Sequence, residues 1–386
     1  MNIAIFTDSF LPGVGGTEKA VLGFALELSK NNNVLLACPK YDGSHDDSKY
    51  PFKVVRVPNL RLYSGDCLAF PNLSKKLKKE LKNFKPDILH CQTVSPMAGF
   101  ALKYGKNHNI PVLMTIHTRF REAFASSIKS KLIVDMLIKD LVKKCHKADE
   151  VATVCNAMAK ELNGYGYKGN TIVIRNGTTI KKEPEKEENS KLSIEKYGLD
   201  KSIPTLLFVG RLSSVKRIDF LLKVFKLLKE KEFAFKSLIV GEGPELNNLT
   251  KITKEYGLEE NVTYTGVVTD PKLLSSIYSS ADLFTFASIF DNDPLVVVES
   301  ACHKTPTIAI ENTGSAERLE NNISGYTTTL KEENFAEKII EIFKDKHTLL
   351  KVNENAFTSV PKEWSETVKE YEAEYKKLIE KKSKKA

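Results

Sequence analysis

The 386-residue chain is long enough for two or three domains with substantial cores. Its 41% hydrophobic and 28% charged residues are typical of a globular protein and exclude long disordered, collagen-like or coiled-coil stretches. No apolar run reaches the roughly 18–20 residues that cross a bilayer, and residues 1–8 lack the basic region of a secretory signal. We therefore expect a cytoplasmic protein.

Cysteine spacing and charge narrow the function classes. The six cysteines contain no CxxC pair, and the histidines show no metal-ligand spacing, so we predict neither a disulfide framework nor a metal site. The net charge of +9 suits a nucleic acid, an anionic membrane surface or an anionic substrate. Only eight of the 58 basic residues are arginine, the side chain that nucleic-acid readers favour, so we expect no nucleic-acid partner.

In the first half of the chain, short β-rich runs alternate with segments of helical period, which predicts a parallel sheet flanked by helices. The strands are predicted at residues 2–7, 33–37, 53–56, 87–90, 111–115, 150–154 and 171–174. The charged run KKEPEKEENS, interrupted by a proline, cannot build a core. We therefore predict a domain at 1–180 and a linker at 181–202.

The alternation then restarts and predicts a second domain at 203–361. Its strands are predicted at residues 205–209, 237–240, 262–265, 283–286, 307–310 and 326–328. Residues 362–386 are predicted to form a C-terminal helix with a lysine-rich tail, and packing back on the first domain is one arrangement open to it. Its apolar stripe repeats every three or four residues: Trp364, Val368, Tyr371, Tyr375 and Leu378.

The fold class is therefore α/β, with two Rossmann-like, doubly wound domains. Ligands of such open sheets bind beyond the carboxyl ends of the strands. We expect the two domains to face each other across a cleft, with the function located between them.

A glycine-rich loop follows the first predicted strand and contains Gly13, Gly15 and Gly16, ahead of a helix expected to start near Lys19. Its backbone N–H groups and the positive helix end suit a phosphate, although a flexible turn has the same composition. The loop is not a GxGxxG fingerprint, and no acidic ribose ligand ends a second strand. Both observations count against a dinucleotide dehydrogenase.

The first strand of the second half leads into Arg211 and Lys216, two cations five residues apart at the start of a helix. They are placed to grip the two phosphates of a diphosphate, the alternative being ordinary surface charges. Cations at a helix start oppose the helix dipole, which favours an anionic partner.

Two carboxylates, Asp291 and Glu299, flank a predicted helix start at which Asp293 is the expected N-cap and Pro294 the first helical residue. Together they suit a polyhydroxylated ligand, although two unrelated surface acids are the simpler alternative.

Two histidines lie at predicted carboxyl ends of strands. His117 directly follows the run PVLMTI and would face a ligand there, donating to a sugar hydroxyl or a phosphate. A lone histidine is more often structural than catalytic. His90 has a similar position with weaker support.

Taken together, the segments FVGRLSSVKRID, VGEGPE, YTGVV and DNDPLVVVES resemble glycosyltransferase family 4, retaining enzymes of the GT-B fold. The segments PDILHCQT and IPVLMTIHT and the Gly15-Gly16 loop resemble the family's acceptor-side domain. The resemblance spans nearly the whole chain and is strongest to the diacylglycerol glucosyltransferase and phosphatidylinositol mannosyltransferase branches.

The resemblance implies a nucleotide-sugar donor, with a UDP-sugar favoured. Arg211 and Lys216 would hold its diphosphate, Glu299 its ribose, and the backbone around Val267 its base. It further implies that the family works without an essential metal or other cofactor, since cations and backbone amides take the metal's place.

The resemblance also implies which groups surround the donor sugar and the phosphates. His117 and Asp291 would lie beside the sugar as catalytic residues. Gly16, with its neighbour Gly15, would approach the phosphates, and the amides of Leu295 and Val296 would support them. Transfer would proceed with retention, by front-face attack assisted by the leaving phosphate.

One departure from the family pattern concerns its E-x7-E pair, of which this chain has Asp291 and Glu299. The first carboxylate is one methylene shorter, and the segment 292–294 lacks the glycines common there. Donor-sugar identity therefore stays open. A glycosyltransferase with a soluble acceptor, and a non-catalytic nucleotide-sugar-binding GT-B protein, remain alternatives.

Residues 71–84 and 125–148 read as basic amphipathic helices in the first domain. One interpretation is peripheral docking on the anionic inner face of the cell membrane, to reach a lipid or membrane-linked saccharide acceptor. The other is packing of each apolar stripe on its own core. The sequence supports both equally.

Overall fold

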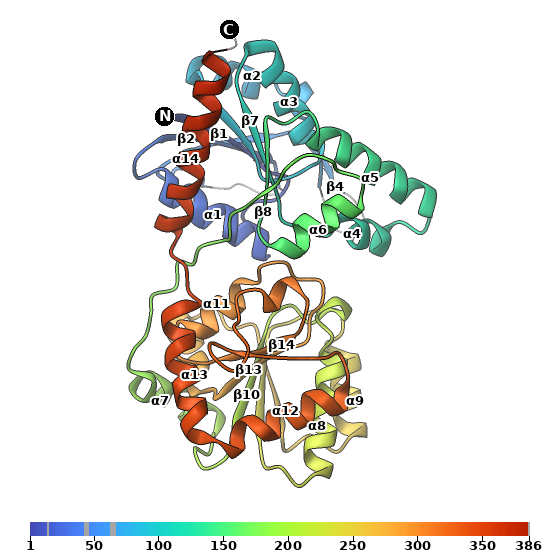
Figure 1. Ribbon diagram of the computed structural model, residues 1–386, viewed down its shortest axis with the longest axis vertical. Helices are drawn as coiled ribbons and strands as arrows, with labels where there is room; N and C mark the ends of the chain where they lie inside the picture. Colours follow the sequence, from blue (N-terminus) through green and yellow to red (C-terminus); the bar gives the residue numbers. More distant parts are fainter. Residues whose placement is uncertain (14, 42–45, 62–66, 385–386) are drawn as a thin grey trace. The chain divides into compact units, whose positions relative to one another are not determined.

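The computed structural model describes residues 1–13, 15–41, 46–61 and 67–384. They form two compact units: unit 1 is Met1–Thr179 with Glu363–Ala386, and unit 2 is Ile180–Lys362. Each unit is a parallel sheet with helices on both faces (Figure 1). Within the described residues, no helix combines the length and the apolarity that crossing a membrane requires.

Unit 1 contains a seven-stranded sheet in the order β3-β2-β1-β6-β7-β8-β9, so the direction of winding reverses between β1 and β6. The strands are β1 (Asn2–Phe6), β2 (Asn33–Pro39), β3 (Lys53–Val57), β6 (Ile88–Cys91), β7 (Val112–Ile116), β8 (Glu150–Thr153) and β9 (Ile172–Val173). The helices are α1 (Gly16–Leu28), α2 (Lys75–Phe84), α3 (Pro96–His108), α4 (Phe120–Ser127), α5 (Lys131–Cys145), α6 (Asn156–Gly164) and α14 (Trp364–Ser383). An antiparallel pair, β4 (Asn59–Arg61) and β5 (Cys67–Ala69), was not predicted because each strand has only three residues.

Unit 2 contains a six-stranded sheet in the order β12-β11-β10-β13-β14-β15, which reverses between β10 and β13. The strands are β10 (Thr205–Val209), β11 (Lys236–Val240), β12 (Val262–Gly266), β13 (Leu283–Phe286), β14 (Thr307–Ile310) and β15 (Tyr326–Thr328). The helices are α7 (Lys186–Tyr197), α8 (Ile218–Glu230), α9 (Leu246–Glu255), α10 (Pro271–Ser280), α11 (Leu295–Ala301), α12 (Glu332–Lys344) and α13 (Lys346–Ser359).

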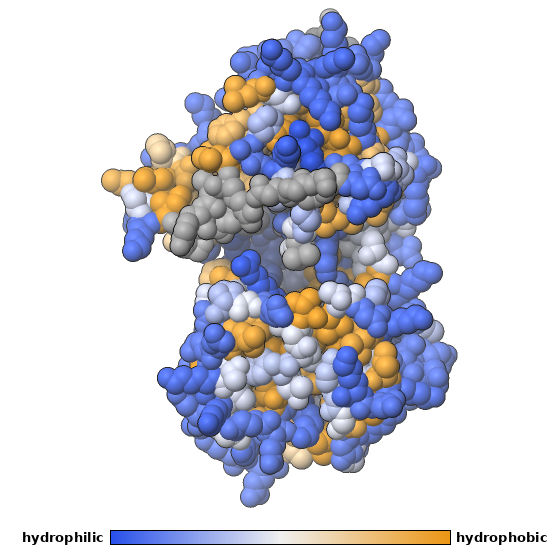
Figure 2. Space-filling model, turned by 180° about the vertical axis from the view of Figure 1, so that it is seen from behind, coloured by the Kyte–Doolittle hydropathy of each residue, from blue (hydrophilic) through white to orange (hydrophobic). Residues whose placement is uncertain are grey.

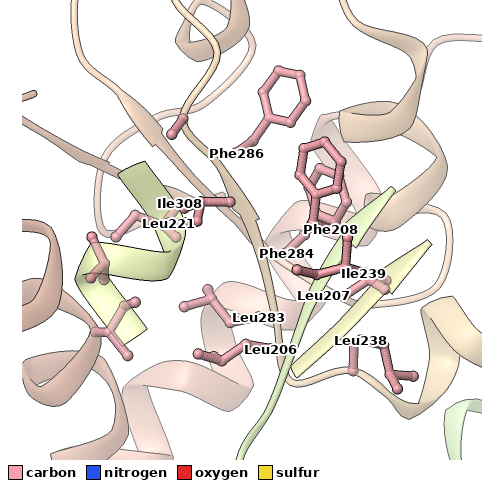
Figure 3. Packing of buried hydrophobic residues seen from close by; sticks show 14 of the residues in the cluster. Leu206, Leu207, Phe208, Leu221, Leu238, Ile239, Leu283, Phe284, Phe286 and Ile308 are labelled. Atoms are coloured by element: carbon pink, nitrogen blue, oxygen red, sulfur yellow. The ribbon is translucent and has the colours of Figure 1, made fainter. Parts of the chain in front are cut away.

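The core of unit 2 shows why its strands were predictable. Because helices cover both faces of a parallel sheet, its strands are continuous apolar runs. Phe208 of β10 and Phe284 and Phe286 of β13 are fully buried and lie together (Figure 3). Burial of each such side chain contributes about 1.5–3 kcal/mol. The two central strands are thereby fixed, and with them the loops that follow.

The predicted linker at 181–202 is instead largely helical and belongs to unit 2. Helix α7 packs on α10, where the Ser193 backbone N–H and hydroxyl bond to the Ser276 hydroxyl and carbonyl, each at 2.8 Å. The Lys186 ammonium donates to the carbonyl oxygens of Ala281 (2.7 Å) and Lys304 (2.9 Å). These contacts are made by serine and lysine side chains. The segment therefore lacks the apolar periodicity from which a packed helix is predicted.

The C-terminal helix α14 is part of unit 1, where it packs against α1. All five residues of its predicted stripe are buried. Trp364 lies so close to Gly23 and Gly177 that a Cβ at either glycine would collide with it. A capping box of Glu363 and Glu366 starts the helix. The last segment of the chain thus completes the first domain.

Candidate functional site

The winding reversal in unit 2 lies between β10 and β13, and the loops leaving these strands carry Arg211 and Asp291. A second loop, residues 241–243, lies against the first: the Leu212 N–H donates to the Glu242 carbonyl at 2.9 Å. Gly241 has φ +130°, and a Cβ there would collide with the Gly210 carbonyl oxygen. Glycine is therefore required for this close approach.

Two of the predicted site residues, Lys216 and Asp291, are in direct contact. The Lys216 ammonium lies 2.6 and 2.8 Å from the two carboxylate oxygens of Asp291, and 5.6 Å from the centre of the Phe286 ring. Lys216 ends a 3₁₀ turn, η2 (Ser214–Lys216), which the Ser288 hydroxyl fixes by donating to the Val215 carbonyl at 3.1 Å. The structure thus joins a predicted phosphate ligand to a predicted catalytic acid.

Arg211 and Val267 lie at the same sheet edge, one after β10 and the other after β12. Both side chains are exposed, Val267 at 57%. The structure brings them to the predicted edge, where a ligand is able to reach them. Their roles toward phosphate and base stay predictions.

Glu299 is buried in α11 and accepts a hydrogen bond from the Tyr278 hydroxyl of α10 at 2.8 Å. Burial, together with the charge of Glu299, raises the pKa of Tyr278 well above its usual value, so the phenol remains a donor. His303 stacks on the Tyr278 ring, with centroids 5.3 Å apart, and its Nδ1 bonds to the Glu299 carbonyl at 2.7 Å. Glu299 is therefore held in one orientation, with one carboxylate oxygen engaged.

The predicted N-cap at Asp293 is wrong. Pro294 is the N-cap, and α11 begins at Leu295. Asp293 instead forms a buried two-pronged ion pair with Arg318, at 2.6 and 2.8 Å, because a guanidinium satisfies both carboxylate oxygens. Leu295 and Val296 are the first two residues of the helix. Backbone N–H groups in the first turn of a helix have no acceptor within the helix.

In unit 1 the winding reverses between β1 and β6, and Asp8 follows β1 there. Its carboxylate accepts hydrogen bonds from the hydroxyls of Thr93 and Ser95, which follow β6. Burial raises the pKa of Asp8 to about 6. Like His117, Asp8 directly follows a predicted strand, so the sequence contained the pattern that identifies it.

His117 directly follows β7 at this edge, and its Nε2 lies 2.5 Å from the Gln92 side-chain oxygen. His90 lies inside β6, fully buried, between Tyr375 and Thr115. The structure thus places His117 at the carboxyl edge of the unit 1 sheet and His90 in the core.

The glycine loop of unit 1 leads into α1, which begins at Gly16 rather than near Lys19. Gly15 is the extended N-cap, and the Lys19 N–H already donates to its carbonyl at 3.2 Å. Space around Gly16 is open, whereas the Glu18 carboxylate lies against Gly15. Residue 14 of this predicted loop lies outside the described residues.

The two basic amphipathic segments differ. In 71–84, helix α2 starts only at Lys75 and buries Leu77 and Leu81 in the core of unit 1, whereas Leu73, ahead of the helix, is exposed. Segment 125–148 is not one helix but parts of α4 and α5, separated by residues 128–130.

Helix α5 buries a face formed by Val134, Ile138, Leu141 and Cys145. On the other side, Leu132 (81%), Ile133 (45%) and Met136 (61%) are exposed.

Sequence reasoning missed Tyr278 and Arg318, which hold Glu299 and Asp293. Neither stands in a local pattern that marks it, because each meets its partner only through folding. Over the part of the chain that the structure describes, no three His, Cys, Asp or Glu side chains converge in a way that would hold a metal ion.

Two family descriptions match this chain in succession. Residues 14–182 match Glycosyltransferase Family 4, and residues 189–359 match Glycosyl transferases group 1. Alpha-monoglucosyldiacylglycerol synthase of Streptococcus pneumoniae is 28% identical over 81% of this chain and 71% of its own length. The enzyme of the same name from Acholeplasma laidlawii is 23% identical over 100% of this chain and 99% of its own.

Among solved structures, HepE from Anabaena in complex with UDP has a TM-score of 0.78 at 18% identity, covering 98% of this chain and 100% of HepE. Sucrose-phosphate synthase from Thermosynechococcus elongatus also has a TM-score of 0.78 at 18% identity, covering 98% of both chains.

Proposed function

The chain belongs to glycosyltransferase family 4 and has the GT-B fold, and from this premise we propose that it transfers a hexose from a UDP-sugar to a membrane-lipid acceptor with retention at the anomeric carbon. The observation that carries the proposal is the group of Arg211, Lys216, Asp291 and Glu299 at the carboxyl edge of the unit 2 sheet. Cations and oriented carboxylates there suit a diphosphate joined to two polyhydroxylated rings.

The donor would lie across the ends of β10 to β13. In this arrangement Arg211 and Lys216 bind the diphosphate, with the amides of Leu295 and Val296 beside it, and Glu299 binds the ribose. Support for a UDP-sugar comes from HepE, which was solved with UDP and with UDP-glucose. No metal cofactor is included, because the two cations supply the charge that the leaving group needs.

The proposed step breaks the bond between the anomeric carbon and the β-phosphate oxygen, and the bonding electrons leave with UDP. Arg211 and Lys216 stabilise the charge that develops on that oxygen. The acceptor hydroxyl attacks from the same face, and its proton passes to the leaving phosphate oxygen. His117 of unit 1 and Asp291 would position the sugar.

A lipid acceptor is supported by the two alpha-monoglucosyldiacylglycerol synthases and by the surface of α5. Leu132, Ile133 and Met136 are exposed near the start of this helix, among Lys129, Lys131 and Lys139. Apolar residues gather at the end of unit 1 that α4 and α5 form, on the left of Figure 2. Apolar side chains enter a lipid interface, and each lysine near an anionic surface adds about 1 kcal/mol.

The position of this apolar patch fits the chemistry. Helix α5 precedes β8 in a parallel sheet, so its first turn lies at the carboxyl edge, the edge that also carries Asp8 and His117. A membrane contact there would bring a lipid hydroxyl toward His117. We therefore propose a cytoplasmic enzyme that binds peripherally to the inner face of the membrane.

The test is transfer of radiolabelled glucose from UDP-glucose to vesicles of anionic phospholipid that contain diacylglycerol or monoglucosyldiacylglycerol. We expect a labelled lipid whose new linkage is α by NMR, and no label with the Arg211→Ala, Lys216→Ala double variant. UDP-galactose, UDP-N-acetylglucosamine and GDP-mannose serve as competing donors.

Three results would contradict the proposal. An inverted product excludes retention, and transfer only from GDP-mannose excludes a UDP-sugar. Binding of UDP-glucose with neither transfer nor donor hydrolysis would show a nucleotide-sugar-binding protein instead of an enzyme.

A further inference from the structure

A continuous chain of buried polar groups connects the C-terminal helix to His117. The Tyr375 hydroxyl of α14 lies 2.5 Å from Nδ1 of His90, and the Gln92 amide nitrogen lies 3.2 Å from Nε2 of His90. The Gln92 oxygen lies 2.5 Å from Nε2 of His117. His90 and Tyr375 have no exposed surface, and Gln92 is 6% exposed, so water does not compete for these bonds.

The chemistry of each group fixes where the hydrogens lie. An amide oxygen only accepts, so Nε2 of His117 carries a hydrogen and donates it to Gln92. Burial lowers the pKa of His90 to about 3, which keeps this ring neutral with a single N–H. The Gln92 amide nitrogen lies 3.2 Å from Nε2 and 3.5 Å from Nδ1 of His90, so it lies over the face of the ring and its N–H points at the ring electrons. In the plane of the ring, the two nitrogens of His90 bond to the hydroxyls of Tyr375 and Thr115, the latter at 2.7 Å.

The groups in this chain are coupled. If the Gln92 amide were reversed, its NH₂ group would face His117 and its oxygen would face His90. The amide oxygen would then face the ring electrons of His90, which accept hydrogen bonds but do not donate them. The His90 ring, held by Tyr375 and Thr115, thus decides which face of Gln92, donor or acceptor, His117 meets.

We propose that Gln92 is the positioning residue of His117, and that α14 sets this position through Tyr375 and His90. The proposal rests on the proposed function only for its effect on turnover, since all four residues belong to unit 1. The final helix of the chain then has a role beyond packing: it orients a side chain at the carboxyl edge of the unit 1 sheet.

The first test measures the His117 ring directly, by ¹⁵N NMR of histidine-labelled full-length protein, with the signal assigned from a His117→Gln variant. We expect a fixed hydrogen on Nε2 in the wild type, and a mixture of both neutral forms in Gln92→Leu and Tyr375→Phe. Thr367→Val is the matched control. It removes another buried hydroxyl from α14, one that donates to the Arg175 carbonyl at 2.9 Å.

The second test measures turnover. Gln92→Leu and Tyr375→Phe should lower kcat about tenfold or more, since small misplacements of a reacting group are costly, with a smaller change in the KM for UDP-glucose. Gln92→Glu restores an acceptor oxygen and should recover most of kcat. Its carboxylate stabilises a protonated His117, so the acidic limb of its pH profile should move to higher pH.

The outcomes separate the two proposals. If the wild type transfers no sugar but the NMR changes occur as expected, the proposed function fails and the positioning chain stands. If transfer is normal and the His117 signals are unchanged in Gln92→Leu and Tyr375→Phe, the positioning chain is overturned. An effect of Thr367→Val equal to that of Tyr375→Phe would also overturn it, because loss of helix packing would then suffice.

Discussion

The Lys216 ammonium holds both carboxylate oxygens of Asp291, at 2.6 and 2.8 Å, where the loops after β10 and β13 meet. About a fifth of each side chain is exposed (21% and 22%), so a ligand at this edge reaches both. An incoming diphosphate would share the lysine with Asp291, and the carboxylate and phosphate charges would repel each other. Removal of the Asp291 charge and removal of the Lys216 charge should therefore change UDP affinity in opposite directions.

Asp291→Asn should bind UDP as tightly as the wild type or more tightly, because the repelling charge is lost and Lys216 is released. Glucose transfer should fall at least tenfold, because Asp291 would contact the glucose of the donor. UDP lacks this sugar, so UDP binding does not report that loss. Calorimetric titration with UDP, alongside kcat for transfer, checks both. A large loss of UDP affinity would mean that Asp291 mainly supports the loop.

Lys216→Ala should weaken UDP binding about 10- to 100-fold, the loss expected for a charge-assisted hydrogen bond of about 1.5–3 kcal/mol. The matched control is Lys223→Ala. Lys223 is an exposed lysine of α8 whose ammonium lies 3.5 Å from Glu332. Equal losses in the two variants would show only the effect of net charge, and would remove Lys216 from the diphosphate site.

Tyr278→Phe should weaken donor binding about tenfold by freeing the Glu299 carboxylate to rotate, and should lower the free energy of unfolding by about 1 kcal/mol. Fluorescence-detected urea unfolding and UDP titration measure the two effects. If Glu299→Gln lowers UDP affinity while Tyr278→Phe leaves it unchanged, Glu299 binds the ribose without help from Tyr278.

Acid should destabilise the protein through His90. The unfolded chain protonates this histidine near its usual pKa of 6.5, whereas the folded ring, desolvated, has a pKa of about 3. Between these values the unfolded state binds more protons, so stability is lost as pH falls. Relative to a His90→Gln variant, the wild-type free energy of unfolding should drop by about 1.4 kcal/mol per pH unit between pH 6 and 4.

Asp8 has the opposite effect over much of the same range. Its folded pKa of about 6 lies above its usual 3.8, so the folded state takes up the extra proton and gains stability as pH falls. Urea unfolding of His90→Gln and of Asp8→Asn across pH separates the two contributions. If the free energy of unfolding changed with pH in parallel for the wild type and His90→Gln, His90 would make no contribution to the loss of stability in acid.

Binding to vesicles should depend on the exposed end of α5. Leu132→Ser with Ile133→Ser should reduce binding to anionic vesicles at least tenfold, since burial of each side chain is worth about 1.5–3 kcal/mol. Leu350→Ser in α13, which removes a leucine of comparable exposure (64% against 81%), should leave binding unchanged. Sedimentation with vesicles measures the binding. Equal binding by all three proteins would exclude α5 as the membrane contact.

The sequence by itself determined the fold class, nearly every strand and which side chains lie at the carboxyl edges of the two sheets. Buried parallel strands are continuous apolar runs, so 205–209 and 283–286 were readable to the residue. The residues just after such a strand lie at the carboxyl edge of the sheet, and this rule predicted the positions of Arg211 and His117. These features depend on near neighbours in the chain.

Only the tertiary structure decided which groups touch. The sequence predicted Asp293 as a helix cap, whereas in the structure Arg318, 25 residues later, binds both of its carboxylate oxygens. Tyr375 reaches His90 across 285 residues. Polar contacts of this kind leave no periodic trace in the sequence, because a single hydrogen bond needs one donor and one acceptor brought together by all the packing around them.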